Sequence, residues 1–354
     1  ENCQEKHEKE EKMTSVNAMR FDEYSGMCVC DEARSWNDEN GRLLTAEKMR
    51  LITSEEVMKA TGAAVIMGKT GTSTLGNEYL ETTKDRLDAH FQKMVKEQGS
   101  PLKKFMTVKE MAHFLFHNLC DVKREHIDHT LRARYGFTSN DFVAGFYKND
   151  AGEKIEIKDK TVIDNVHKIM TWEGMCPDSR SIFLNAQIVA GYEPKEGFRI
   201  FKSSLIAPHC EAVHEIFTCD GSGVDSTDFA FTAFANTRSI AERRGKIDRV
   251  EGLVNLLEAL NMANTSSAGC DGYLKIQYIN GREKNPLDRC KEIHDHRSVL
   301  ALEIVKGALH GFVPWQKTYD LVEGLIYEGR DFLEVNDEMK RAATNLKGLM
   351  DMLR

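Results

Sequence analysis

The order of apolar patterns along the chain predicts a layered α+β sandwich. Short strand-like runs occur in groups, and pairs of helical patterns separate these groups. A doubly wound parallel sheet would instead alternate single strands with single helices. With 354 residues and no internal repeat, the chain could form two average domains or one large domain with additions. We favour a single sandwich with additions.

The first third of the chain predicts a leader, two strand pairs and two helices. Residues 1–12 are almost all charged or polar, which is typical of a leader or surface extension. Two β-type runs flank the turn sequence DEYS and predict an opening hairpin, and a second strand pair should follow. These strands are expected near 14–21, 26–30, 49–52 and 62–68.

Helical spacing begins at Ser73, where apolar residues recur on one face. A second helix should begin at Thr107, where T-V-K-E has the capping-box pattern. Residues 121–175 are highly charged and contain NDAGEKIEIKDK, which resembles a hairpin. We expect this segment to be an insertion or a lid.

The second half of the chain repeats the strand and helix groups. Strands are expected at 182–191, 197–206, 212–218 and 273–279, helices at 226–236 and 248–263, and a helical extension over 286–354.

Composition excludes several classes of protein. Lys and Arg number 48 against 56 Asp and Glu, and the resulting net charge of −8 argues against a nucleic-acid partner. No apolar run approaches the roughly 20 residues that span a bilayer, so we expect no membrane partner. The nine cysteines are odd in number and lack paired spacing. They favour free thiols in a reducing compartment, and therefore a cytoplasmic protein.

One segment fits a relaxed phosphate-loop pattern, AAVIMGKT at 63–70. A phosphate loop needs an open backbone whose N–H groups point at the anion. The apolar residues in the middle of this segment favour a buried strand instead, so we expect no nucleotide and no other cofactor.

Two histidine clusters could suggest a metal site. His209, Cys210 and His214 lie close together in the sequence, as do His294 and His296. Positions 209 and 214 would point to opposite faces of one strand, and an i, i+2 pair diverges on a helix. We expect no metal.

The opening hairpin suggests a third chemistry, an amino-terminal nucleophile. A threonine at a chain start can attack through its hydroxyl and use its own α-amine as base. Thr14 opens the first strand, Asp31 ends the second, and Lys48 precedes the next. These charges could set the protonation of the site, and the N–H of Gly68 could approach the reacting carbonyl.

Five segments carry a resemblance to a known family. They read TSVNAMRFDEYSGMCVCDEARS, GAAVIMGKTGTST, IFLNAQIVAGYEPKEGFRIF, FTCDGSGVDSTDFAF and GYLKIQYI. In order and approximate spacing they resemble segments of proteasome β-type subunits and of the related bacterial HslV peptidase. The resemblance covers most of 14–120 and 180–285.

The resemblance implies a four-layer αββα sandwich, the Ntn-hydrolase fold, in a homo-oligomeric ring or stack. It implies that Thr14 attacks a peptide or amide carbonyl of a peptide or protein substrate. It also implies that Asp31 and Lys48 polarise Thr14, that Gly68 serves the oxyanion, and that Ser222 holds the α-amine.

The chain departs from the family pattern at several positions. Met13 precedes Thr14, where self-cleaved precursors of the family usually carry glycine, although translation from Met13 would also expose Thr14. Ser267 and Cys270 align with the aspartate and serine of the family. The insertion ITSEEVMKAT could move the lysine assignment to Arg50. A catalytically inactive structural or assembly subunit is therefore the alternative function.

These patterns together predict three parts of the chain. Residues 1–13 would be a propeptide-like leader or an assembly arm, and 14–285 the hydrolase-like domain with its insertion at about 121–175. Residues 286–354 would be the C-terminal helical extension.

Overall fold

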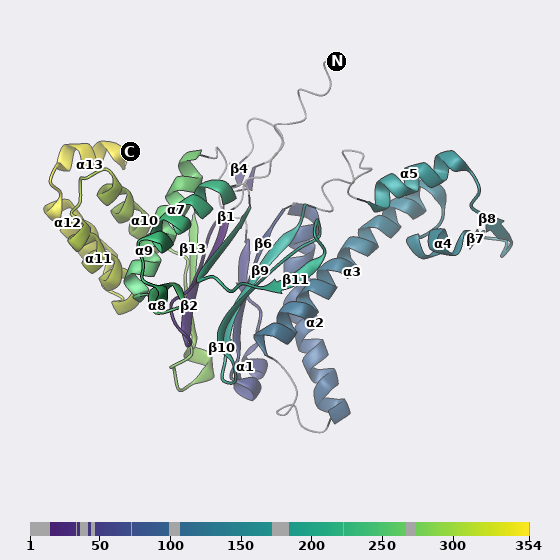
Figure 1. Cartoon of the computed structure of the whole chain (residues 1–354), viewed down its shortest axis with the longest axis horizontal. Coiled ribbons are helices and arrows are strands. Elements are labelled where there is room, and N and C mark those ends of the chain that lie inside the picture. The colour runs from purple at the N-terminus through teal and green to yellow at the C-terminus, as the bar shows by residue number, and fades with distance from the viewer. Residues whose placement is uncertain are drawn as a thin grey trace, which may run out of the picture.

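The computed structural model describes residues 15–32, 34–35, 42–43, 47–71, 73–98, 107–171, 184–221, 223–266 and 273–353. Two five-stranded sheets face each other, and helices cover the outer face of each sheet (Figure 1). The fold is therefore the predicted four-layer α+β sandwich, with an added segment and added C-terminal helices. The predicted leader, residues 1–13, lies outside the described residues.

The first sheet contains the opening hairpin and has the strand order β12-β1-β2-β13-β14. All its neighbouring strands are antiparallel. Its strands are β1 (Ser15–Arg20), β2 (Ser25–Asp31), β12 (Phe217–Gly221), β13 (Leu274–Asn280) and β14 (Cys290–Ile293). The turn between β1 and β2 is fixed by the carboxylate of Asp22, which accepts the N–H groups of Tyr24 and Ser25. β14 lies beyond the expected domain boundary at 285, yet it belongs to this sheet.

The second sheet has the order β11-β10-β9-β6-β5. Its strands are β5 (Met49–Leu51), β6 (Ala64–Thr70), β9 (Ala186–Glu193), β10 (Gly197–Ser204) and β11 (His209–Ala212). β5 and β6 form the second predicted strand pair, and the short helix α1 (Glu55–Thr61) lies between them in the sequence. A two-stranded sheet of β3 (Arg34–Ser35) and β4 (Arg42–Leu43) follows β2 in the chain.

The predicted strand at 212–218 is wrong. This stretch contains the end of β11 and the start of β12, which belong to different sheets. Val213 packs in the core between the sheets and Ile216 is buried. Apolar residues thus continue through the crossover, and their pattern resembles that of one strand.

Apolar side chains fill the space between the two sheets, and many of them are small or β-branched. Of these, the first sheet contributes Val16, Ala18, Cys28 and Cys30, and the second contributes Ala64, Ile66, Ile188 and Ala190. β1 and β6 lie close together at Gly68, where an added Cβ would lie 2.4 Å from Cγ1 of Val16. The described cysteines, six of the nine, are all free thiols.

Two helical layers cover the outer faces. Helices α2 (Ser73–Gln98) and α3 (Val108–Tyr135) pack on the second sheet, and α7 (Val224–Asn236) and α9 (Arg249–Ser266) pack on the first. The predicted capping box is present, because Thr107 and Glu110 each bond the backbone N–H of the other. A short helix, α8 (Ile240–Arg243), joins α7 to α9. No helix in the described ranges is long and apolar enough to cross a membrane.

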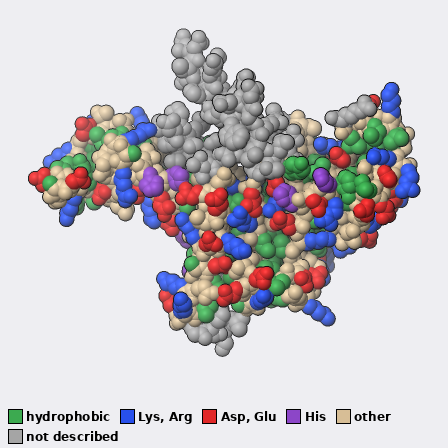
Figure 2. All heavy atoms as spheres, turned by 180° about the vertical axis from the view of Figure 1, so that it is seen from behind, with side chains coloured by type: hydrophobic (Ala, Val, Ile, Leu, Met, Phe, Trp, Pro, Cys, Tyr) green, Lys and Arg blue, Asp and Glu red, His purple; other side chains and the backbone are tan. Residues whose placement is uncertain are grey.

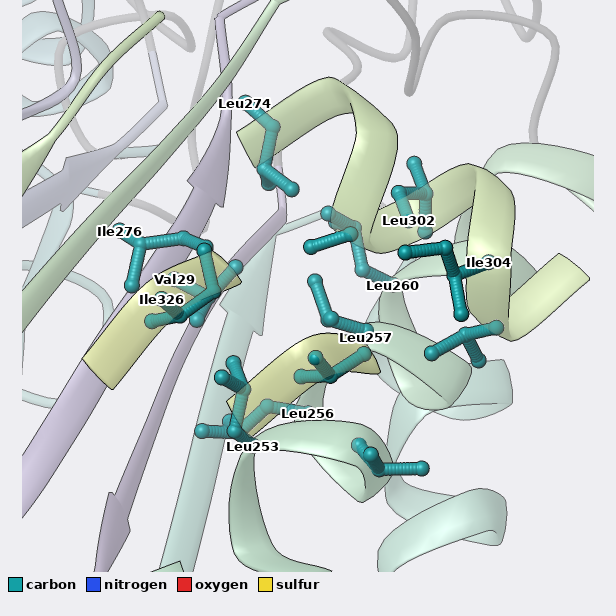
Figure 3. Packing of buried hydrophobic residues seen from close by; sticks show 14 of the residues in the cluster. Val29, Leu253, Leu256, Leu257, Leu260, Leu274, Ile276, Leu302, Ile304 and Ile326 are labelled. Carbon is teal, nitrogen blue, oxygen red and sulfur yellow. The ribbon is translucent and has the colours of Figure 1, made fainter. Parts of the chain in front are cut away.

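The C-terminal helices form a further layer against α9 (Figure 1). They are α10 (His296–Leu309), α11 (Trp315–Glu323), α12 (Phe332–Ala342) and α13 (Leu346–Met352), and a π-helical turn (Gly324–Glu328) follows α11. A 3-10 turn (Pro286–Asp288) precedes β14. Side chains of α9, α10 and the π-helical turn meet those of β2 and β13 in one apolar core (Figure 3).

The predicted insertion lies at the far end of α3, which projects from the sandwich (Figure 1). We call residues 127–170 the arm. It contains the end of α3, then α4 (Ser139–Ala144), the predicted hairpin of β7 (Phe146–Lys148) and β8 (Lys154–Glu156), and α5 (Lys160–Met170). α3 runs unbroken through the expected start of the insertion at 121.

Candidate functional site

A lysine and an aspartate form a buried ion pair where the first strand of the sandwich begins. Nζ of Lys48 lies 2.8 Å from Oδ2 of Asp31, and the two residues expose only 5% and 2% of their surface. The other carboxylate oxygen, Oδ1, accepts the backbone N–H of Ser15 at 2.7 Å. Asp31 therefore joins Lys48 to the residue that follows Thr14.

The strand arrangement explains why these two residues meet. Asp31 is the last residue of β2, and Lys48 directly precedes β5. The carbonyl of Lys48 accepts the N–H of Lys69 in β6 at 2.8 Å. Because β2 and β5 belong to different sheets, the ion pair links the two sheets. Removal of either partner would leave an uncompensated buried charge.

Arg50, the alternative to Lys48, points to a different partner. Its guanidinium bonds the carboxylate of Glu47, with 3.2 Å between Nε and Oε1. This hydrogen bond raises the pKa of Arg50. Lys48 is the residue of this segment that contacts Asp31.

Gly68 lies inside β6, between β5 and β9. The N–H of Lys69 points to β5, so the N–H of Gly68 points the opposite way, towards β9. Gly68 is therefore part of the hydrogen-bonded ladder, and its evident role is to let β1 approach. Gly71 lies one residue beyond the end of β6 and has a positive φ of 106°.

Two of the predicted site residues, Thr14 and Ser222, lie outside the described residues. Their neighbours Ser15 and Gly221 face each other across β1 and β12. The positions at which the chain departs from the family pattern are also outside the described ranges: Met13, Ser267 and Cys270.

A second group of charges, which was not predicted from the sequence, lies beside the ion pair. Oε2 of Glu32 lies 2.5 Å from Nε2 of His294. Burial raises the pKa of Glu32, although His294 and Lys275 oppose this effect. Lys275 lies 3.4 Å from Glu47 and 3.3 Å from Glu292. We call these five residues the charged cluster. The only feature of the sequence that could have indicated this cluster is that Glu32 directly follows Asp31.

A polar bridge links the two sheets beside β1, and it too was missed. Oγ1 of Thr70 lies 2.5 Å from Oδ2 of Asp220, and Nζ of Lys202 lies 3.3 Å from Oδ1 of the same carboxylate. Asp220 faces Val16 across β12 and β1. Charged side chains therefore connect the two sheets on each side of β1. Lys48 and Asp31 do so on the β2 side, and Lys202 and Asp220 do so on the β12 side.

The segment with the phosphate-loop pattern is a strand. Residues Ala64–Thr70 form β6, in which every residue is buried, and α2 begins only at Ser73. The predicted buried strand is confirmed. Its backbone N–H groups belong to the sheet ladder and cannot cradle a phosphate.

Three of the four histidines in the two candidate metal clusters have partners of their own. His209, on β11, pairs with Glu211 at 3.2 Å. His294 bonds Glu32, whereas the ring of His296 packs against α12. Within the described residues, no group of three or more His, Cys, Asp or Glu side chains could hold a metal ion.

Comparisons with known proteins give a distant structural similarity. No family model matches the chain, and no curated protein matches it either. Among solved structures, Anbu (ancestral beta-subunit) from Yersinia bercovieri is similar over 84% of this chain and 93% of its own, with 10% identity and a TM-score of 0.49. A likeness at this level identifies neither a family nor an activity.

The predicted membership of the proteasome β-subunit and HslV-like family is therefore wrong, because no family model or curated relative supports it. The segments that suggested it are short hairpins and glycine turns. A sandwich of antiparallel strands requires such elements for its own geometry. The fold, by contrast, follows from the observed sheets and helical layers.

Proposed function

We propose that the chain hydrolyses peptide or amide bonds with the hydroxyl of Thr14 as nucleophile. The buried ion pair of Lys48 and Asp31, bonded to the N–H of Ser15, is the observation that carries this proposal. Ser15 is covalently joined to Thr14. Asp31 therefore holds the Lys48 ammonium near the start of β1, and a lysine ammonium close to the Thr14 hydroxyl would favour its deprotonated form.

The chemistry requires Thr14 to be the first residue of the active chain. Its hydroxyl oxygen would then attack the carbonyl carbon while its α-amine accepts the hydroxyl proton. The amine proton passes to the leaving nitrogen, and an ester to Thr14 remains. Water then attacks the ester with the same amine as base, and this step releases the acid and restores the hydroxyl.

The oxyanion needs N–H donors that are not used by the sheet. Gly68 was the predicted donor, but its N–H points along the ladder towards β9. We assign the donor role to the end of β6, with Gly71 as the candidate glycine. Ser222 retains its proposed role as a partner of the α-amine, because its neighbour Gly221 lies opposite Ser15.

The state of the Thr14 amine tests the proposal. Intact-mass measurement identifies the first residue of the native chain, and a threonine-directed β-lactone reports a reactive hydroxyl. We expect labelling of a chain that starts at Thr14 and none in Thr14→Ala. A chain that retains residues 1–13 and resists the lactone would leave the alternative, an inactive assembly subunit.

Two buried lysines give a matched comparison for the same assay. Lys48→Met should reduce labelling by about 100-fold or more, because it removes the charge beside the reacting groups. Lys275→Met removes an equally buried lysine from β13, the strand beside β2. In this variant the labelling of Thr14 should fall by less than about tenfold. Equal losses in the two variants would assign Lys48 a purely structural role.

We also propose that the chain forms a homo-oligomer. Phe229 of α7 and Ile240 of α8 expose 68% and 70% of their surface, so these helices offer large apolar side chains for contact with a second copy. Light scattering coupled to size exclusion measures the oligomeric state.

Acidic and basic side chains are interspersed over the described part of the face in Figure 2, which supports the expectation of no nucleic-acid partner.

A further inference from the structure

The residue that follows Asp31 is held from two directions. The backbone N–H of Glu32 donates to the carbonyl of Tyr273 at 2.8 Å. Its side chain is 98% buried and contacts His294, which comes from a segment 262 positions away in the chain. Glu32 therefore fixes the point at which the chain leaves β2, directly after the carboxylate that holds Lys48.

His294 lies at a rigid junction between the sheet and the C-terminal helices. The residue before it, Ile293, ends β14 and is buried. The residue after it, Asp295, caps α10 by accepting the N–H of Arg297 at 2.9 Å. The hydroxyl of Ser298 donates to the carbonyl of Leu274 at 2.6 Å, which ties the first turn of α10 to β13. The imidazole of His294 thus has a fixed place relative to Glu32.

The two partners differ strongly in their contact with water. The His294 side chain is 39% exposed, whereas that of Glu32 is 2% exposed. The charged groups that face Glu32 are His294, Lys275 and Glu47. The Glu32 side chain cannot gain a water molecule as a substitute partner, so its hydrogen bond with the imidazole is costly to lose.

We propose that Glu32 and His294 form a positioning pair for Asp31, and that their contact holds the Asp31 carboxylate in place for Lys48. The pair connects the C-terminal helices to the start of β1. Its effect on hydrolysis rests on the proposed function, whereas its effect on the ion pair does not. Neither residue is placed among the reacting groups.

Three variants test the pair by activity. Glu32→Gln replaces the carboxylate and His294→Gln replaces the imidazole, and each keeps a hydrogen-bonding side chain. His126→Gln is the control, because Nε2 of His126 lies 2.9 Å from Oε2 of Glu78 in a more exposed pair between α3 and α2. We expect labelling of Thr14 to fall about tenfold in Glu32→Gln and in His294→Gln. His126→Gln should label at the wild-type rate.

A second measurement decides the proposal without catalysis. NMR of protein with isotope-labelled lysine follows the Lys48 side chain, whose signal is assigned by its loss in Lys48→Met. The signal should move from its wild-type position in Glu32→Gln and in His294→Gln, and should stay there in His126→Gln. A Lys48 signal that is alike in all these proteins overturns the positioning pair. Absent labelling together with a Lys48 signal that moves in this way would overturn only the proposed hydrolase.

Discussion

The two additions to the sandwich differ in how they join it. The C-terminal helices share an apolar core with the sheet: Ile304 of α10 and Ile326 of the π-helical turn belong to the same buried cluster as Val29 and Ile276 (Figure 3). The arm has a separate cluster of five buried residues: Ile127, Leu131, Phe137, Val166 and Ile169. The C-terminal helices are therefore part of the structure that positions the site, whereas the arm has its own small core.

This difference predicts two kinds of stability. Residues that share one core should unfold together, because each loses its contacts when the others do. A small separate cluster can open locally while the rest of the molecule stays folded. Mutations in the two additions should therefore be distinguishable by whether the site responds.

The largest effect is expected from the C-terminal core. Leu325 is fully buried in the cluster that includes the first sheet. Leu325→Ala should reduce the free energy of unfolding by about 2–5 kcal/mol, because it leaves a cavity. Urea unfolding followed by circular dichroism should show one shifted transition. Loss of the C-terminal helices before the sheet would contradict a shared core.

A smaller effect is expected where the two sheets approach each other. Gly68→Ala should reduce stability by about 1–3 kcal/mol, because the new Cβ would lie 2.4 Å from Val16. The double variant Val16→Ala, Gly68→Ala should recover much of this loss. Recovery of Thr14 labelling with stability would identify a packing role for Gly68. Lost labelling in a variant with restored stability would instead support an oxyanion role.

The sequence predicted the parts of the fold that have a clear local pattern. The opening hairpin was predicted because two short β-type runs flank the turn sequence DEYS, and β6 because it begins with the apolar run AVIM. β14 was missed because CKEI is a short edge strand with a mixed polar pattern. The expected start of the insertion at about 121 lies inside α3, because α3 keeps its helical pattern beyond the point at which it leaves the sandwich.

The site was predictable only in part, for a related reason. Asp31 and Lys48 occupy strand ends, so their positions could be inferred from the hairpin and from the strand that follows. The contact between Glu32 and His294 depends on the pairing of β13 with both β2 and β14. No local pattern specifies that register, and the two residues are 262 positions apart.

The pH dependence of stability should report the burial of Glu32. Burial raises its pKa in the folded protein above the ordinary value of a glutamate. The folded protein therefore holds this proton to higher pH than the unfolded chain, and wild-type stability should fall as pH rises from the ordinary glutamate pKa through the raised one. Glutamine cannot titrate. The stability of Glu32→Gln relative to wild type should thus increase over this interval and then level off in urea unfolding, and a decrease would contradict the raised pKa.

The smallest effect on the sandwich should come from the arm. Ile169 of α5 is 2% exposed within the separate cluster, so Ile169→Ala should weaken the arm by about 2–5 kcal/mol. Because this cluster shares no buried residue with the sandwich core, the urea transition of the sheets should move by less than about 0.5 kcal/mol. Hydrogen exchange should instead become faster in α4 and α5 alone. Leu325→Ala is the matched comparison, since it removes a similar apolar side chain from the shared core. If Ile169→Ala lowered the stability of the sheets as much as Leu325→Ala does, the arm would share a core with the sandwich, as the C-terminal helices do.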